Sequence, residues 1–69
     1  MIADQVELDI DVQKYMEIVK WCNTYIGNKA IWKDNVNEHN PWTVDAPFRC
    51  YTWYFACEKD AIMFRLRWL

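Results

Sequence analysis

The residue types in this sequence that best suit a zinc ion are its three cysteines and one histidine. The cysteines show no C-x-x-C spacing, and the sequence contains no second histidine that could join the first. Cys50, Cys57 and His39 could in principle converge on a zinc ion, which takes thiolate and imidazole ligands. Free cysteine is also among the most buried residue types, so buried thiols and a loop imidazole explain the same residues. We favour this second interpretation and expect no metal and no cofactor.

Two further arrangements could support catalysis. Glu38 and His39 are adjacent polar residues, but the sequence offers no evident third partner for them. Cys57 precedes a predicted helix, whose N-terminus would lower the pKa of the thiol and make it more reactive. The alternative, which we favour, is an unreactive thiol buried near the helix cap. The sequence has no Ser-His-Asp arrangement and no paired carboxylates on a helix face. We therefore expect no catalytic residues and a protein that is not an enzyme.

The distribution of charge bears on the class of partner. The formal net charge is −2, and the first 17 residues hold five acids against one base. The last eleven residues hold three bases against one acid. A nucleic-acid-binding domain usually presents a basic stripe, which this sequence lacks. A DNA mimic needs a denser array of acids, so nucleic acid is not an expected partner in either role.

Length and composition favour a protein partner. The chain has 69 residues, enough for one domain, and twelve of them are aromatic. A domain of this size buries only about 60% of the surface of its unfolded chain. It therefore relies on disulfides, a metal or a partner subunit for additional stability. Aromatic side chains are enriched at interface centres, so we expect the surplus aromatics to contact another protein.

The first eleven residues, MIADQVELDID, lack the basic and apolar regions of a signal peptide. No stretch approaches the roughly 18 consecutive apolar residues of a membrane span. The cysteines are odd in number and have no framework spacing, which favours free thiols in a reducing cytosol. We expect a cytoplasmic protein that does not bind a membrane.

The N-terminal part of the chain predicts a strand followed by a helix. Residues 5–10 alternate apolar and polar side chains, which indicates a strand with one buried face. Asp11 is a good N-cap for a helix that ends near residue 26, where Gly27 suits a left-handed C-cap. Ile18, Trp21 and Tyr25 fall beside the apolar stripe of this helix, where either a loop covers them or a partner contacts them. The stripe itself, at the helical period, consists of Val12, Tyr15, Met16, Val19, Cys22 and Ile26.

The middle of the chain is less regular. Residues 30–33 could form a short strand, and residues 34–47 are rich in asparagine and proline, which predicts an irregular loop. We expect Trp42 and Val44 to fold back over the core as a lid. Residues 48–56 form the strongest predicted strand. One of its faces carries Tyr51, Trp53 and Phe55, which we expect to meet the helix, and the other carries Cys50, Thr52 and Tyr54. Stacked aromatics on a sheet can bind RNA, but the basic and glycine pattern of such domains is missing.

The last predicted element is a helix that begins at Glu58 and has apolar residues on more than one side. Ala61, Phe64 and Trp68 form one stripe, and Ile62, Leu66 and Leu69 form a second, roughly 100° away on the helical wheel. The first helix, the long loop or another chain must cover the second stripe. We predict a homo-oligomer interface made by Ile62, Met63, Leu66 and Leu69.

The predicted order of elements is β-α-β-β-α. It indicates an α+β fold in one domain, residues 1–69, with two helices on one face of a three-stranded antiparallel or mixed sheet. This arrangement is similar to half of a ferredoxin-like domain.

The C-terminal sequence also resembles a family. Trp53-Tyr54-Phe55, Glu58-Lys59-Asp60-Ala61 and Phe64-Arg65-Leu66-Arg67-Trp68 resemble the W-x-F, E-x-D-A and F-x-L-R-W block of small uncharacterised accessory proteins of tailed phages. The likeness extends to Lys20-Trp21-Cys22. It implies a phage protein made in the bacterial cytoplasm, and it implies no reaction. Packing in the core explains most of these residues, but Arg67 must pair with Asp60 or Glu58, or meet a partner.

These observations lead to a functional hypothesis. We expect a non-enzymatic protein that binds a host protein, such as a defence nuclease, a CRISPR effector or the transcription machinery, and blocks or redirects it. Alternatives are a self-assembling module and a sponge for small ligands or nucleotides, although one glycine and scattered bases argue against phosphate binding. Large aromatics carry interface energy. The candidate partner-binding residues are Ile18, Trp21, Tyr25, Trp42, Tyr54 and Arg67.

Overall fold

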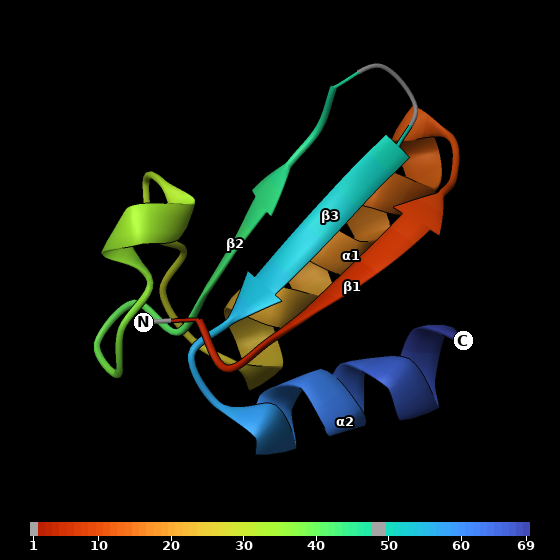
Figure 1. The fold of residues 1–69 in the computed structure, drawn as a ribbon. Helices are drawn as coiled ribbons and strands as arrows, with labels where there is room; N and C mark the ends of the chain where they lie inside the picture. Colours follow the sequence, from red (N-terminus) through yellow and green to blue (C-terminus); the bar gives the residue numbers. More distant parts are fainter. Residues whose placement is uncertain (1, 48–49) are drawn as a thin grey trace.

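The computed structural model describes residues 2–47 and 50–69. Their order confirms the predicted α+β class and the β-α-β-β-α order, with one short 3₁₀ helix added (Figure 1). The elements are β1 (Asp4–Asp9), α1 (Val12–Tyr25), η1 (Lys33–Asn35), β2 (Trp42–Asp45), β3 (Cys50–Phe55) and α2 (Glu58–Trp68). The strand predicted at residues 48–56 is β3, and its first two residues lie outside the described part of the chain.

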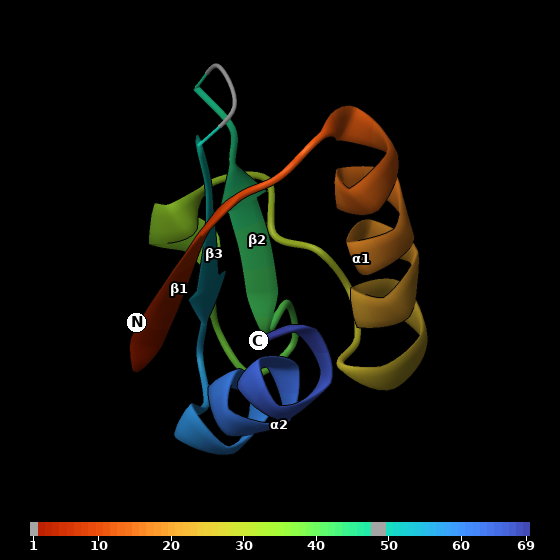
Figure 2. The same ribbon diagram turned by 90° about the vertical axis from the view of Figure 1, so that its right-hand side faces the viewer.

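The three strands form one sheet in the order β1-β3-β2. The central strand, β3, is antiparallel to both neighbours, with Asp4 opposite Phe55 in one pair and Trp42 opposite Phe55 in the other. The edge strands β1 and β2 therefore run parallel to each other and form a split β-α-β unit around β3. Figure 2 shows α1 on one side of the sheet and η1 on the other, with α2 beside the lower end of the sheet.

The ends of α1 follow from its sequence. The Asp11 carboxylate accepts a hydrogen bond from the backbone N–H of Lys14 at 2.8 Å, which is the expected N-cap contact. At the other end the N–H groups of Ile26 and Gly27 both donate to the carbonyl of Cys22. Gly27 has φ +140°, a conformation that side-chain-bearing residues rarely adopt, so the only glycine in the chain ends the helix. Both predicted helix boundaries are confirmed to within one residue.

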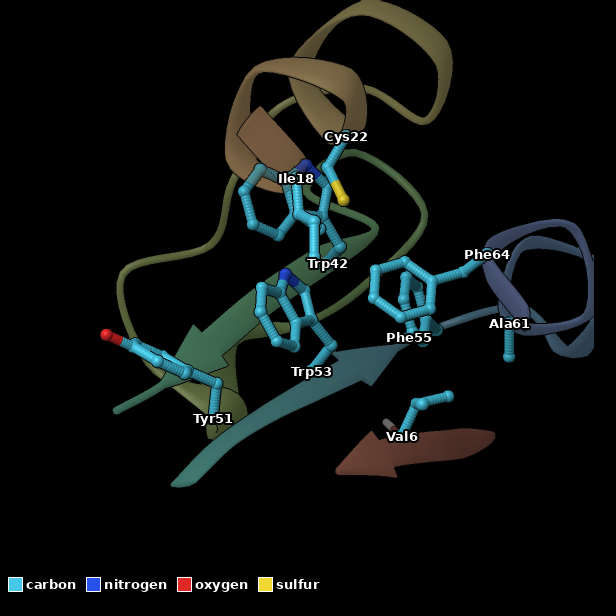
Figure 3. Packing of buried hydrophobic residues seen from close by; sticks show 9 residues of the cluster. All are labelled: Val6, Ile18, Cys22, Trp42, Tyr51, Trp53, Phe55, Ala61 and Phe64. Carbon is cyan, nitrogen blue, oxygen red and sulfur yellow. The ribbon is translucent and has the colours of Figure 1, made fainter. Parts of the chain in front are cut away.

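The main hydrophobic core lies between the sheet and the two helices. Trp53 and Phe55 of β3 meet Phe64 of α2, with ring centroids 5.3 and 5.2 Å apart (Figure 3). Trp42 donates its indole N–H to the carbonyl of Gly27 at 2.8 Å, whereas the buried N–H of Trp53 has no partner among the described residues. The prediction that Tyr51, Trp53 and Phe55 share the inward face of β3 is confirmed. The buried members of this core are Val6, Ile18, Cys22, Trp42, Tyr51, Trp53, Phe55, Ala61 and Phe64.

The buried face of α1 differs from the prediction. Ile18 and Cys22 are fully buried, whereas Val12 and Met16 are 64% and 65% exposed. The true core face is rotated by roughly 50° around the helix toward Ile18, as judged from 100° per residue. The reason is α2, which packs against Trp21 and so moves the core toward that side of α1.

The segment between α1 and β3 also differs from the prediction. Residues 30–33 are not a strand, since only Lys29 forms an isolated parallel bridge with Trp42 and η1 begins at Lys33. The predicted irregular loop at residues 34–47 contains the strand β2, so Trp42 belongs to the sheet and not to a lid. This segment covers the second face of the sheet, where a small cluster of Ala30, Val36 and Tyr54 is buried.

Candidate functional site

A shallow depression of about 350 Å³ lies between α1 and α2. We call it the helix-pair patch. It combines aromatic rings from both helices with charged side chains at its rim. Its lining residues are Glu17, Lys20, Trp21, Thr24, Tyr25, Arg67 and Trp68.

Trp21 is the centre of the aromatic part of the helix-pair patch. Its ring meets the rings of Trp68 and Phe64 edge-on, with centroids 6.1 and 6.2 Å away. Tyr25 lies one helical turn later on the same face of α1, 5.5 Å from Trp21 between ring centroids. Trp21 and Trp68 are half-buried, while Tyr25 is 64% exposed. The patch therefore consists of two rings anchored to the core and one ring presented to solvent.

Cations surround Trp68. The guanidinium carbon of Arg67 lies 4.2 Å from the ring centroid of Trp68, and the ammonium of Lys14 lies 5.3 Å from it. Both distances fit cation–π attraction. The ion pairs found among residues 2–47 and 50–69 do not include Arg67, so its charge is balanced by neither Asp60 nor Glu58. Among the described residues, Glu17 is the one acid that lines this patch, and its Oε2 lies 3.9 Å from the Lys14 ammonium.

The structure brings three of the predicted partner-binding residues together and separates the other three from them. Trp21, Tyr25 and Arg67 share the helix-pair patch. Ile18 and Trp42 are 1% and 0% exposed, so the prediction that they contact a partner from the surface is wrong.

Tyr54 is also buried, in the small cluster on the opposite face of the sheet, and it does not belong to the patch. The sequence predicts Trp68 in the core, and its half-buried ring does pack against the core, but the ring also lines the helix-pair patch. Its position beside Arg67, at the last turn of a helix, was the signal for a surface role.

A second apolar surface lies on α2, outside the helix-pair patch. Leu66 and Leu69 are 84% and 73% exposed, and Ile62 and Met63 are 48% and 38% exposed. We call these four residues the α2 stripe. Because these side chains stay exposed, neither α1 nor the loop predicted at residues 34–47 covers them, and two of the three explanations offered by the sequence are removed. Self-association through the stripe stays a prediction.

The cysteines and the histidine do not gather into one site. Cys50 begins β3 and Cys57 is the N-cap residue of α2, and both are exposed, which corrects the expectation that both are buried. Burial raises the pKa of the Cys22 thiol to about 12, and desolvation and Glu7 raise the pKa of Cys50. His39 is exposed, with Nε2 3.9 Å from a Glu38 carboxylate oxygen. Within the described residues, no three His, Cys, Asp or Glu side chains are placed to hold a metal ion.

The described part of the chain contains no helix with the length and apolar character needed to cross a membrane. Comparison of the chain with protein-family models, with curated proteins and with solved structures found no match. The geometry of its surfaces is therefore the basis for a functional proposal.

Proposed function

We propose that this chain is a non-enzymatic, phage-encoded protein that binds a host protein in the bacterial cytoplasm. It inhibits or redirects that protein by steric occlusion. A defence nuclease, a CRISPR effector and the transcription machinery are the classes of target that fit this role. The observation that carries the proposal is the helix-pair patch, in which Trp21, Tyr25, Trp68 and Arg67 meet.

The composition of the helix-pair patch supports protein binding. Tryptophan, tyrosine and arginine are the residues most enriched at interface hot spots. Here Trp21 and Trp68 hold each other in an edge-to-face contact, so little side-chain freedom remains to be lost on binding. Tyr25 and Arg67 add an exposed ring and an exposed guanidinium, which can contact both apolar and acidic groups of a partner.

The test is affinity capture from host lysate, followed by titration of the purified partner. We expect Tyr25→Ala and Arg67→Ala each to weaken the affinity about 10-fold or more, as at interface hot spots. Met16→Ala is the matched control for Tyr25→Ala, because it lies on the same helix at the same exposure, 65% against 64%. The side chains of Tyr25 and Arg67 are both exposed, so these two variants should keep the fold. Equal affinity for both folded variants and the wild type would exclude the helix-pair patch as the binding surface.

The α2 stripe favours a second candidate function, self-assembly. Two copies would pair the same surface across a two-fold axis. Light scattering up to about 100 µM tests this, with Leu66→Glu as the variant that places a charge in the pairing surface. A molecule that stays monomeric over the whole concentration range excludes self-assembly and leaves the stripe available to a foreign partner.

A further inference from the structure

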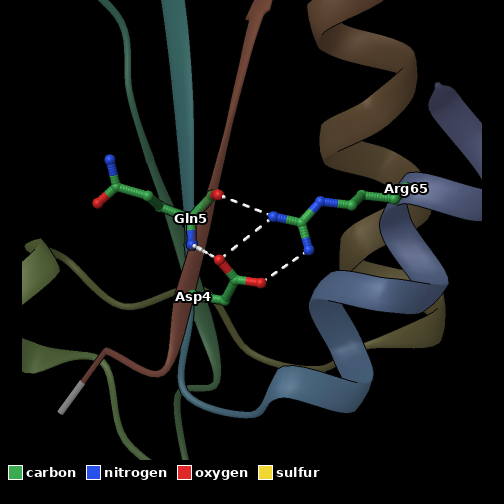
Figure 4. A network of polar contacts seen from close by, with 3 residues as sticks. All are labelled: Asp4, Gln5 and Arg65. Carbon is green, nitrogen blue, oxygen red and sulfur yellow. Dashed lines mark hydrogen bonds and ion pairs between the residues drawn. The ribbon is translucent and has the colours of Figure 1, made fainter.

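The two edges of the sheet differ in how well they are protected. On β1, the guanidinium of Arg65 bonds the Asp4 carboxylate at 2.7 and 3.2 Å and donates to the carbonyl of Gln5 at 3.2 Å. Figure 4 shows this side chain reaching from α2 across to the strand. The same edge carries the exposed acids Glu7 and Asp9. Covered carbonyls and charged side chains are common devices against pairing with another strand.

Within the described part of the chain, the outer edge of β2 is paired at Trp42 but not at Val44. Pro41 accepts a hydrogen bond from Ala56 on the β3 side, whereas Trp42 accepts one from Ala30 on the opposite side at 2.7 Å. Backbone groups alternate in direction along an antiparallel strand, so Val44 presents its N–H and C=O on the same outer side as Trp42. Lys29 pairs only with Trp42, and the described residues form no further bridge along this edge.

An apolar groove lies next to this free edge. It has a volume of about 200 Å³ and is lined on one side by Ile31, Trp32 and Lys33 and on the other by Val44, Asp45 and Tyr54. Ile31 and Trp32 are 86% and 68% exposed.

Their exposure follows from the path of the chain. The carbonyl of Ala30 accepts a bond from the Thr43 hydroxyl at 2.8 Å, and the next residues lead into η1, which lies beside β2 but forms no bridge with it. The chain thus leaves the edge after one bridge and places two large apolar side chains beside it.

We infer that this edge of β2 is a docking site for an extended segment of a partner protein. The segment pairs its backbone with the N–H and C=O of Val44 and places one apolar side chain in the groove beside Trp32. Peptides bind open sheet edges in this way, with main-chain bonds setting the register and pockets selecting side chains. Lys33 and Asp45 give the groove charges of both signs, so an uncharged segment fits it better than an acidic or a basic one. This docking site is separate from the helix-pair patch.

The test selects a display library of random heptapeptides on the immobilised protein. The enriched peptides are then synthesised and titrated. We expect enrichment of uncharged sequences with a central apolar residue and about 10-fold or greater weakening by Trp32→Ala. Met16→Ala, exposed on α1 away from the groove, should leave the affinity unchanged. A peptide with proline at the pairing position should not bind, because proline has no N–H to donate. Hydrogen exchange should show the Val44 amide becoming protected when the peptide is added.

Three results would each overturn the inference. The first is no enrichment above background. The second is unchanged peptide affinity for folded Trp32→Ala, or no added protection of the Val44 amide. The third is protection of that amide by rising protein concentration alone, which would assign the edge to a second copy of the chain. If the function proposed for the helix-pair patch is wrong, the Tyr25→Ala variant will capture the host protein as well as the wild type does. That measurement does not depend on the groove beside β2, so the two failures can be distinguished.

Discussion

Two apolar residues on α2 should respond very differently to truncation. Phe64 is fully buried against the rings of Trp53 and Phe55, whereas Leu66, two positions later, is 84% exposed. We predict that Phe64→Ala destabilises the fold severely and that Leu66→Ala barely changes its stability. The pair is well matched, because both changes remove a bulky apolar side chain from one helix and leave the best helix-forming residue.

The size of the effect follows from burial. Removing a buried phenylalanine side chain costs about 3–5 kcal/mol through lost transfer energy and the cavity left behind. A chain of 69 residues has an expected free energy of unfolding of about 3–10 kcal/mol, from about 0.05–0.15 kcal/mol per residue. Phe64→Ala therefore removes a third to all of the stability. A surface change such as Leu66→Ala should stay within about 0.5 kcal/mol of the wild type.

Urea unfolding followed by tryptophan fluorescence measures both variants. With a slope of about 1 kcal/mol/M, Phe64→Ala should lower the midpoint by about 3 M or more, or leave no cooperative transition. Phe64→Leu keeps an apolar side chain and should fall between the wild type and Phe64→Ala. The placement of Phe64 at the centre of the core is refuted if its alanine variant unfolds within about 0.5 M of Leu66→Ala.

Three other predictions concern single groups. The hydrogen bond from the Arg65 guanidinium lowers the pKa of the Asp4 carboxyl from its ordinary value. This contact therefore stabilises the fold above about pH 4, and its contribution is lost as the pH falls through the lowered pKa. In Asp4→Asn, the urea midpoint should fall less steeply with decreasing pH than it does in the wild type. Burial raises the pKa of Cys22 to about 12, so at pH 8 a thiol reagent should label the two exposed cysteines of the folded protein before Cys22, which should react only on unfolding. Labelling of Cys50 should be slowed by its own raised pKa, and labelling of Cys22 as fast as that of the exposed cysteines would contradict the prediction. Gly27→Ala should lower the free energy of unfolding by about 1–3 kcal/mol, because φ at this position is +140° and the new methyl group would lie 3.1 Å from Pro41 Cγ. An unchanged urea midpoint would contradict this prediction.

Local signals in the sequence predicted most of the elements. The capping residue Asp11, the single Gly27 and the alternation in β1 and β3 each act over a few residues, so they can be recognised without the rest of the fold. The strand β2 was missed because its four residues lie between two prolines in an asparagine-rich stretch. Its structure depends on pairing with β3, and strand propensity is weak compared with such non-local contacts.

The candidate site was predicted only in part, because it too depends on contacts between elements that are far apart in the sequence. Trp21, Tyr25 and Arg67 were recognised as residues that a core does not need. Which side of α1 is buried depends on where α2 packs, and a helical wheel of α1 alone carries no information about that contact. Ile18 was therefore placed at the surface, and Trp68 was not recognised as part of the helix-pair patch.

The pairing of β1 with β3 has a consequence for the chain during its synthesis. The strand β1 leaves the ribosome first, yet Asp9 and its partner Cys50 are 41 positions apart. At about 5–20 residues per second the strand waits roughly 2–8 s for its partner. Throughout that interval Val6 and Leu8 are exposed to neighbouring nascent chains on the same messenger. Glu7 and Asp9 alternate with them, and like charges directly opposite one another disfavour pairing between two such strands. We expect these acids to matter most before the fold exists, as a safeguard against aggregation on the polysome.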